Sequence, residues 1–212
     1  MAHVTINEMM RQHEFDFTAP AMLQANEIPL ASSRLLILGC SASKAEGDGL
    51  SALDRYTGPL WQTLKAVDPD GSLAQVAYLS AKFGLGDARG QLPFYNSLLT
   101  GRSADAMLKH GLCGVYPHYD TGFRSQSARD RHLSTRHRLQ TPAAEIVRLA
   151  RRAGRPLDDV AICGGKEYVR VARGLVAEMK AHGFVEPTAE VTIINDQIGY
   201  MRAGLRRWLT SS

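Results

Sequence analysis

The chain has 212 residues, of which 44% are hydrophobic and 22% are charged, and its formal net charge is +4. A chain of this kind buries a sizeable core without disulfide or metal support, and no apolar run approaches the about 18 to 20 residues that span a membrane. The N-terminal residues are polar and of mixed charge, which excludes a signal peptide, and the three cysteines follow neither a disulfide framework nor a zinc spacing. We therefore expect a cytoplasmic, reduced protein, with a monomer favoured.

The apolar pattern predicts one α/β domain over residues 34–212 after an N-terminal arm at 1–33. Four apolar runs predict strands at 35–39, 75–80, 159–163 and 190–194. Helical spacing predicts helices at 52–67, 96–110, 141–152, 168–182 and 199–209, the first of them interrupted by Gly58-Pro59. Residues 84–95, with three glycines and Pro93, predict a loop. Strands separated by helices indicate a mostly parallel sheet of about four or five strands.

Small polar and basic residues follow the first two predicted strands. The first strand leads into Cys40, Ser41 and Lys44, and the second leads into Ser80 and Lys82. Open α/β sheets bind ligands outside the carboxyl ends of their strands, so we expect one composite site there. Cys40 is either a nucleophile or a small packing residue. Lys44 and Lys82 are candidate catalytic cations, and the alternative for Lys44 is a solvated side chain.

The later part of the chain adds further candidates for the same site. Tyr95 and Asn96 offer a stacking ring and a two-sided amide for reading a base edge, although Tyr95 could equally be a core tyrosine beside a helix cap at Asn96. Gly164 and Tyr168 suit a site wall or a plain strand-to-helix turn. Asp196 is the only acid at a strand exit, where it either positions water and stabilises a sugar cation or caps the last helix. No phosphate-binding loop or dinucleotide fingerprint is present, and we expect no metal and no organic cofactor.

The segment 111–140 is rich in arginine and poor in regularly spaced apolar residues. Guanidinium groups match the geometry of phosphate, so the segment is predicted to bind a nucleic-acid backbone, DNA more than RNA. The alternative is a solvated helix face. The arginines predicted to contact phosphates are Arg124, Arg129, Arg131, Arg136 and Arg138. Three aromatic residues are candidates to fill the gap left by a flipped base: Tyr116, Tyr119 and Phe123.

Several short motifs together resemble a known group of proteins. They are Cys40-Ser-Ala-Ser-Lys44, Tyr56-Thr-Gly58, Leu79-Ser-Ala-Lys-Phe-Gly-Leu85, Pro93-Phe-Tyr95 and, more loosely, Gly164-Gly-Lys-Glu-Tyr168 and Ile198-Gly199. The chain resembles the Cys-Ser-x-x-Lys family related to YaaA-type proteins, and it is similar to the corresponding segment of archaeosine synthase, a tRNA base-modifying enzyme. The match covers residues 34–100 well and 158–209 loosely.

This resemblance implies the three-layer α/β sandwich of uracil-DNA glycosylases and action at a nucleobase. Our main expectation is a DNA glycosylase that hydrolyses the N-glycosidic bond of a modified base, for example in phage DNA, after the base flips into the site. A base-modifying transferase similar to archaeosine synthase is one alternative. The other is a non-catalytic DNA-binding stress protein of the YaaA type.

Overall fold

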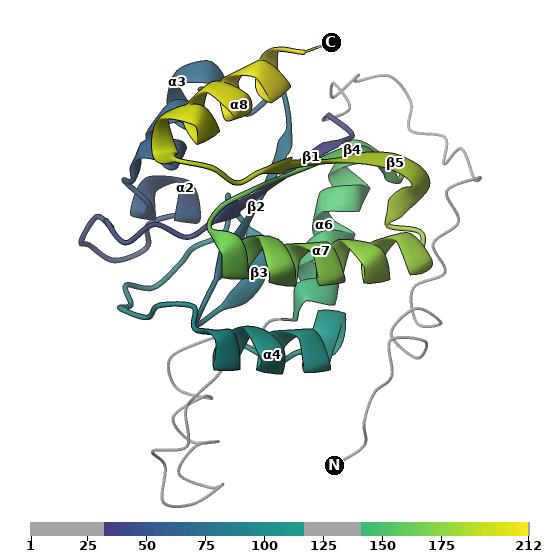
Figure 1. The fold of residues 1–212 in the computed structure, drawn as a ribbon, viewed down its shortest axis with the longest axis horizontal. Helices are drawn as coiled ribbons and strands as arrows, with labels where there is room; N and C mark the ends of the chain where they lie inside the picture. The colour runs from purple at the N-terminus through teal and green to yellow at the C-terminus, as the bar shows by residue number, and fades with distance from the viewer. Residues whose placement is uncertain (1–31, 117–140, 212) are drawn as a thin grey trace, which may run out of the picture.

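The computed structural model describes residues 32–116 and 141–211, and these form an α/β fold around one five-stranded sheet (Figure 1). The strands span Arg34–Gly39 (β1), Gln75–Ser80 (β2), Gly84–Asp87 (β3), Leu157–Cys163 (β4) and Val185–Ile194 (β5). They lie in the order β3-β2-β1-β4-β5. Neighbouring strands are parallel except for β2 and β3, which form an antiparallel pair at one edge of the sheet.

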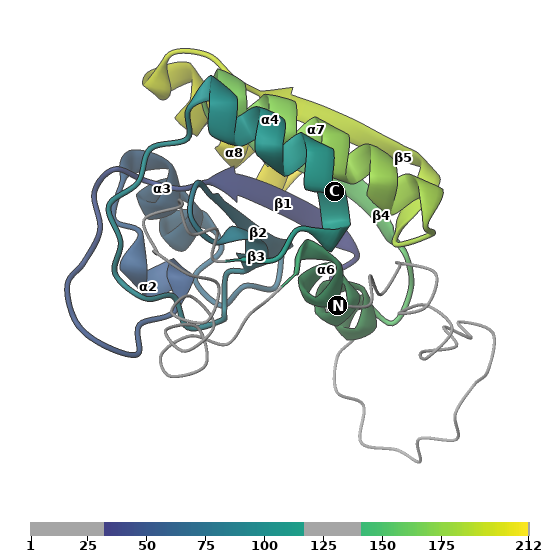
Figure 2. The same ribbon diagram turned by 90° about the horizontal axis from the view of Figure 1, so that it is seen from below.

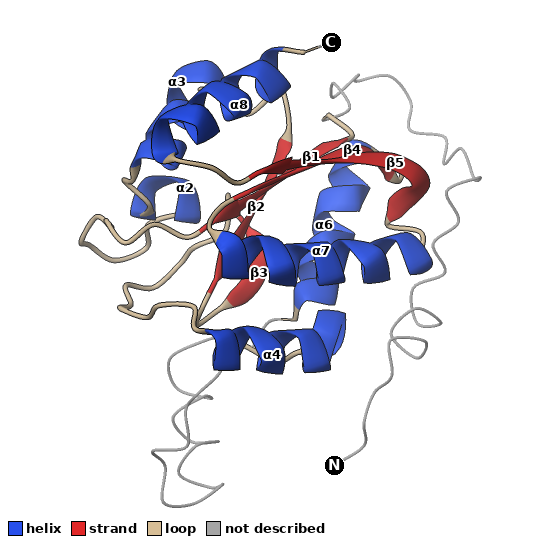
Figure 3. Ribbon diagram, viewed as in Figure 1, coloured by secondary structure: helices blue, strands red, loops and turns tan. Residues whose placement is uncertain are grey.

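Helices cover both faces of the sheet, so the fold has three layers (Figure 3). One face carries α2 (Ala52–Arg55), α3 (Pro59–Val67) and α8 (Ile198–Thr210). The other face carries α4 (Gly101–His110), α6 (Pro142–Ala153), α7 (Lys166–Ala181) and the short 3₁₀ turn η1 (Gly111–Cys113). On this second face α4 and α7 lie side by side (Figure 2). The α/β class and the mostly parallel sheet predicted from the sequence are confirmed.

The middle strand, β1, is buried on both faces, and this explains its unbroken apolar sequence. Leu35 and Ile37 pack into the core formed with α4, α6 and α7. Leu36 and Leu38 pack into the core formed with α3 and α8. Side chains alternate between faces along a strand, so a strand covered on both sides needs an apolar residue at every position. These two cores hold the end of β1, Gly39, between β2 and β4.

Most predicted elements are present, and the differences have local causes. All four predicted strands form, and the predicted break at Gly58-Pro59 separates α2 from α3. The loop predicted at 84–95 is partly wrong, because β3 forms within it and pairs with β2. The helix expected to begin at Asn96 begins at Gly101, since Thr100 and Ser103 form a capping box there.

The basic insertion predicted over 111–140 begins later than expected, because residues 111–116 belong to the core. Leu112 is fully buried, and the ring of Tyr116 packs against Gly84. Gly84 has a φ of +65°, and a Cβ there would lie 2.7 Å from the Tyr116 ring, so this contact requires glycine. Tyr116 is only 3% exposed, so the prediction that it fills the gap left by a flipped base is wrong.

Two predicted segments fall largely outside the described ranges. These are the N-terminal arm, of which only residues 32–33 are described, and residues 117–140 with Tyr119 and Phe123. The hydroxyl of Ser33 is buried and donates a hydrogen bond to the carboxylate of Asp158, which ties the start of β1 to β4. No helix within 32–116 or 141–211 is long and apolar enough to cross a membrane.

Candidate functional site

The carboxyl ends of β1 and β4 form the point at which the chain changes direction across the sheet. From β1 the chain passes to β2 on one side, whereas from β4 it passes to β5 on the other side. The two ends are close together, since a Cβ on Gly39 would lie 3.5 Å from the Cα of Gly164. In open α/β sheets this switch point is the usual position of a ligand. The loop that begins at Cys40 leaves the sheet here.

The loop after β1 is held by a short antiparallel pairing with the end of α2. Lys44 forms a bridge with Tyr56, and hydrogen bonds flank it from Ala45 N–H to the Arg55 carbonyl (2.8 Å) and from Thr57 N–H to the Ser43 carbonyl (3.1 Å). This pairing places two of the motifs identified in the sequence, Cys-Ser-x-x-Lys and Tyr-Thr-Gly, in one structural unit.

Gly58 completes this unit, because it lies directly against Ser41. A Cβ at Gly58 would overlap the hydroxyl of Ser41 and would come within 3.0 Å of the Ser41 Cβ. The Ser41 hydroxyl accepts a hydrogen bond from the Ser43 N–H at 3.1 Å. Glycine is therefore favoured at position 58 for steric reasons, since a side chain there would displace the Ser41 hydroxyl, although the backbone conformation suits any residue.

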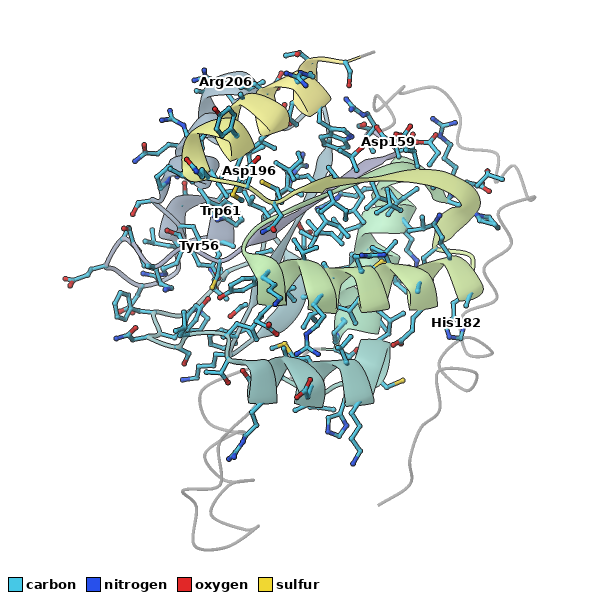
Figure 4. The ribbon with its side chains drawn as sticks, in the orientation of Figure 1. Tyr56, Trp61, Asp159, His182, Asp196 and Arg206 are labelled. Carbon is cyan, nitrogen blue, oxygen red and sulfur yellow. The ribbon has the colours of Figure 1, made fainter. Side chains whose placement is uncertain are left out.

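Two tyrosines meet beneath the loop. The hydroxyls of Tyr56 and Tyr95 lie 2.6 Å apart, and both side chains are almost completely buried. Tyr95 is therefore a core tyrosine, the alternative to its predicted role as a stacking ring. Tyr56 also packs against Trp61, with ring centroids 4.7 Å apart, and the indole N–H of Trp61 donates to the Gly39 carbonyl at 3.0 Å. Figure 4 shows Tyr56 and Trp61 together on the side of the molecule where the parallel strands end.

Lys44 supplies a positive charge above these rings. Its ammonium group lies 4.6 Å from the centroid of the Tyr95 ring and 6.0 Å from that of Tyr56. It donates one hydrogen bond, to the Ser41 carbonyl at 2.7 Å. An ammonium group has three donors, so Lys44 can make further hydrogen bonds to a ligand. The alternative that Lys44 is a fully solvated side chain is wrong, since it is half-buried and held in place.

Cys40 and Tyr168 join the ends of β1 and β4. The Cys40 sulfur lies 2.9 Å from the Tyr168 hydroxyl. A Cβ on Gly39 would lie 3.2 Å from the Tyr168 ring, and one on Gly164 would lie 3.2 Å from the Tyr168 Cβ. Cys40 is a half-buried free thiol. Cys163, by contrast, is fully buried, and burial raises the pKa of its thiol to about 12, so it stays protonated. Of these two thiols, Cys40 is therefore the one that a ligand can reach.

The three tyrosines of the cluster are hydrogen-bond donors at neutral pH. Burial is the main cause that raises the pKa of Tyr56, Tyr95 and Tyr168, and nearby ionisable groups, Cys40 among them, raise it further. Their hydroxyls therefore keep their protons. A neutral hydroxyl both donates and accepts, and that of the half-buried Tyr168 is the one of the three that the edge of an uncharged heterocycle can reach.

Ser80 and Lys82 belong to the turn that links β2 to β3. The buried hydroxyl of Ser80 accepts hydrogen bonds from the N–H groups of Lys82 and Phe83, both at 3.1 Å, and it also interacts with the Tyr95 hydroxyl. The Phe83 ring meets the Tyr95 ring edge-on at 5.2 Å, and the Lys82 ammonium lies 5.8 Å from the Phe83 ring. Both predicted residues thus adjoin the tyrosine cluster.

Two predicted site residues are exposed. Asn96 lies on the surface. It does not cap α4 either, because the N-cap residue of that helix is Thr100. The exposed carboxylate of Asp196 accepts the N–H of Gln197 at 2.6 Å. Its neighbour Asn195 donates to the Gly164 carbonyl at 2.7 Å, which ties the exit of β5 to that of β4. Asp196 thus lies on the same side of the molecule as Tyr56 and Trp61 (Figure 4).

Among residues 32–116 and 141–211, no group of three or more histidine, cysteine or acidic side chains could hold a metal ion. The five arginines predicted to contact phosphates, Arg124, Arg129, Arg131, Arg136 and Arg138, lie outside the described residues. Nucleic-acid binding by that segment therefore stays a prediction.

Two residues of the site are missed by sequence reasoning. The motif Tyr56-Thr-Gly58 includes Tyr56, but no pattern points to Trp61 or to Arg55, although Arg55 is only 1% exposed. One sequence signal for this junction is available. Gly58-Pro59 comes soon after Arg55-Tyr56, and the structure ends α2 at Arg55 and starts α3 at Pro59. Comparisons of the chain with protein-family models, with curated proteins and with solved structures give no match.

Proposed function

We propose that this chain is an enzyme that acts on a nucleobase, and that it hydrolyses the N-glycosidic bond of a modified base in DNA. The observation that carries this proposal is the cluster at the ends of β1 and β4, where Lys44 lies over the Tyr95 ring next to Tyr56 and the Cys40–Tyr168 pair. Aromatic rings, neutral hydroxyls and one cation are the groups that bind a flat, polar heterocycle. The resemblance to nucleobase-acting proteins supports the same substrate class.

Base recognition uses the hydroxyls and the thiol. Tyr168, the half-buried tyrosine of the cluster, binds at the base edge through a hydroxyl that stays uncharged at neutral pH. Cys40, half-buried between Tyr168 and Tyr95, limits the space for substituents on the base. A site that hydrogen-bonds a particular edge rejects a base lacking the matching groups, because buried polar atoms are then left unpaired.

Bond cleavage builds positive charge on the sugar and negative charge on the departing base. The ammonium of Lys44 or Lys82 stabilises the negative charge, and a fixed cation in a partly dry site is effective in this role. Asp196 acts on the sugar side, where its carboxylate orients water and stabilises the cation. Its exposure in the described structure means that bound DNA has to cover it.

An assay for abasic sites tests this proposal. The full chain is incubated with DNA from phages that carry modified bases and with ordinary DNA, and abasic sites are counted. We expect them in a modified DNA. Asp196→Asn should lower the rate at least about a hundredfold, a usual effect of removing a group that assists proton transfer. Glu190→Gln, at an exposed position of β5, is the matched control and should leave the rate unchanged.

Transfer chemistry at the base is a second candidate function, and the position of Cys40 favours it. The Cys40 thiol is free, half-buried and hydrogen-bonded to the Tyr168 hydroxyl at the switch point. A cysteine in this position can form a covalent intermediate with a base. In that case Cys40→Ser abolishes activity, whereas hydrolysis without a covalent intermediate tolerates this change.

A further inference from the structure

Arg55 is a buried cation whose described contacts include no acid. Its side chain is 1% exposed, and its guanidinium donates to three main-chain carbonyls, those of Leu92 (3.0 Å), Ala45 (2.5 Å) and Gly47 (2.7 Å). These hydrogen bonds satisfy the donors, but carbonyl groups carry no net charge. The positive charge of Arg55 is therefore not neutralised by these contacts.

Lys44 is a second cation in the same main-chain pairing as the first. Ala45, which follows Lys44, exchanges hydrogen bonds with Arg55 in both directions, from Ala45 N–H to the Arg55 carbonyl and from the Arg55 guanidinium to the Ala45 carbonyl. In the described part of the chain, neither cation forms an ion pair. The acids of the same loop, Glu46 and Asp48, are exposed to solvent.

Two cations in one main-chain pairing, with no ion-pair partner among the described residues, are unfavourable. Removing a charged group from water costs free energy that an opposite charge normally offsets. Here the hydrogen bonds of Arg55 offset only part of that cost, and Lys44 keeps donors available. The local field therefore favours a ligand that brings negative charge before any reaction begins.

We propose that Lys44 and Arg55 form an anion subsite that holds a phosphate of the target nucleotide. Lys44 contacts the phosphate oxygens directly, and buried Arg55 adds positive charge from beneath the loop. This assignment rests on the proposed function, since it identifies the anion as part of a nucleotide. It also gives the two lysines different roles. Lys44 binds the phosphate, and Lys82, in the turn after β2, is then the cation next to the departing base.

Titration calorimetry of the full chain tests the subsite with deoxynucleosides, the corresponding deoxynucleoside monophosphates, inorganic phosphate and a short single-stranded oligonucleotide. We expect a monophosphate to bind about tenfold or more tightly than its nucleoside, the worth of one charge-assisted hydrogen bond. The advantage should disappear in Lys44→Met. It should persist in Lys65→Met, which removes an exposed lysine of α3.

The four ligands also separate the possible sources of the phosphate. Binding of both the monophosphate and the oligonucleotide, with inorganic phosphate at least about tenfold weaker, supports a nucleotide ligand. Inorganic phosphate binding as well as a monophosphate contradicts it, and so does equal or undetectable binding of nucleoside and monophosphate. A monophosphate preference without base release from any DNA would support the subsite and refute the glycosylase function. Base release from a modified DNA without a preference for the monophosphate would support the glycosylase function and refute the subsite.

Discussion

Lys44 and Tyr56 face each other across an antiparallel bridge, although eleven residues separate them along the chain. The bridge joins the loop after β1 to the junction between α2 and α3. It sets the Lys44 ammonium over the Tyr95 ring, whose hydroxyl meets that of Tyr56. The charge and the rings of the candidate site therefore depend on one short stretch of main-chain pairing.

The contact between Gly58 and Ser41 gives the first prediction. Gly58→Ala should lower the free energy of unfolding by about 1–2 kcal/mol, because the added Cβ overlaps the Ser41 hydroxyl and displaces it from the Ser43 N–H. Chemical denaturation measures this effect. The same change in a Ser41→Gly background should cost less than about 0.5 kcal/mol. Equal costs in both backgrounds would show that the two residues are not coupled.

Removal of Arg55 is the second prediction. Arg55→Met should lower the free energy of unfolding by about 3 kcal/mol, because it removes three hydrogen bonds and leaves the buried Leu92 carbonyl without its donor. The matched control is Arg89→Met, since Arg89 is exposed and its guanidinium donates to the Gly71 carbonyl at the surface. The control should cost less than about 1 kcal/mol. If the two variants lower the free energy of unfolding by similar amounts, the hydrogen bonds of Arg55 do not stabilise the fold as proposed.

Alkaline pH should destabilise the protein through its buried tyrosines. Burial raises the pKa of Tyr116 to about 12 from an ordinary value of 10.0. Between these values the unfolded chain loses the proton and the folded protein keeps it, so stability is fully present below pH 10 and falls as the pH rises toward 12. Tyr116→Phe should reduce the fall by up to about 3 kcal/mol.

Denaturation at a series of pH values checks this dependence. Met107→Leu, in the same core as Tyr116, removes no titrating group and should leave the slope of stability against pH unchanged. A Tyr116→Phe variant with the slope of the parent protein would mean that the hydroxyl ionises equally in the folded and unfolded states.

The basic segment gives the fourth prediction. Replacing Arg129, Arg131 and Arg136 with alanine should weaken DNA binding for all sequences alike. It should also flatten the dependence of binding on salt by about one unit for each phosphate that the protein no longer neutralises. Binding titrations at several salt concentrations measure this slope. A control triple variant at exposed positions of the described structure, Arg89, Lys109 and Arg173, should keep the parent slope. Equal slopes in the parent and the Arg129, Arg131 and Arg136 variant would make the segment an ordinary solvated surface.

The fold was largely predictable because burial leaves a direct trace in the sequence. The apolar runs of β1, β2 and β4 are fully or mostly buried, and Thr141 before Pro142 marks the start of α6. The sequence pattern misses β3 because its four residues include two glycines, which resemble a loop. Gly86 is there for a different reason, since a Cβ at that position would collide with the Tyr78 ring on the neighbouring strand.

The site was only partly predictable, because its contacts join distant parts of the chain. Cys40, Ser41 and Lys44 can be identified from their position after a strand, which is a local property. The pairing of Tyr56 with Tyr95 spans 39 residues and is supported by a second main-chain bridge, between Ser51 and Gln91, which no local pattern reveals. Charge alone does not reveal Arg55, because what sets it apart is that it is buried with no acidic partner among residues 32–116 and 141–211.

Mass spectrometry of free bases and nucleosides from a single DNA sample treated with the full chain tests the central claim most directly. The proposed hydrolysis predicts release of one free base, with an equal number of abasic sites and no altered nucleoside. The yield should fall in Lys82→Met and Asp196→Asn. An altered nucleoside with its sugar bond intact would indicate transfer at the base instead. If the protein binds the modified DNA but leaves every base and nucleoside unchanged, enzymatic action on the base is contradicted.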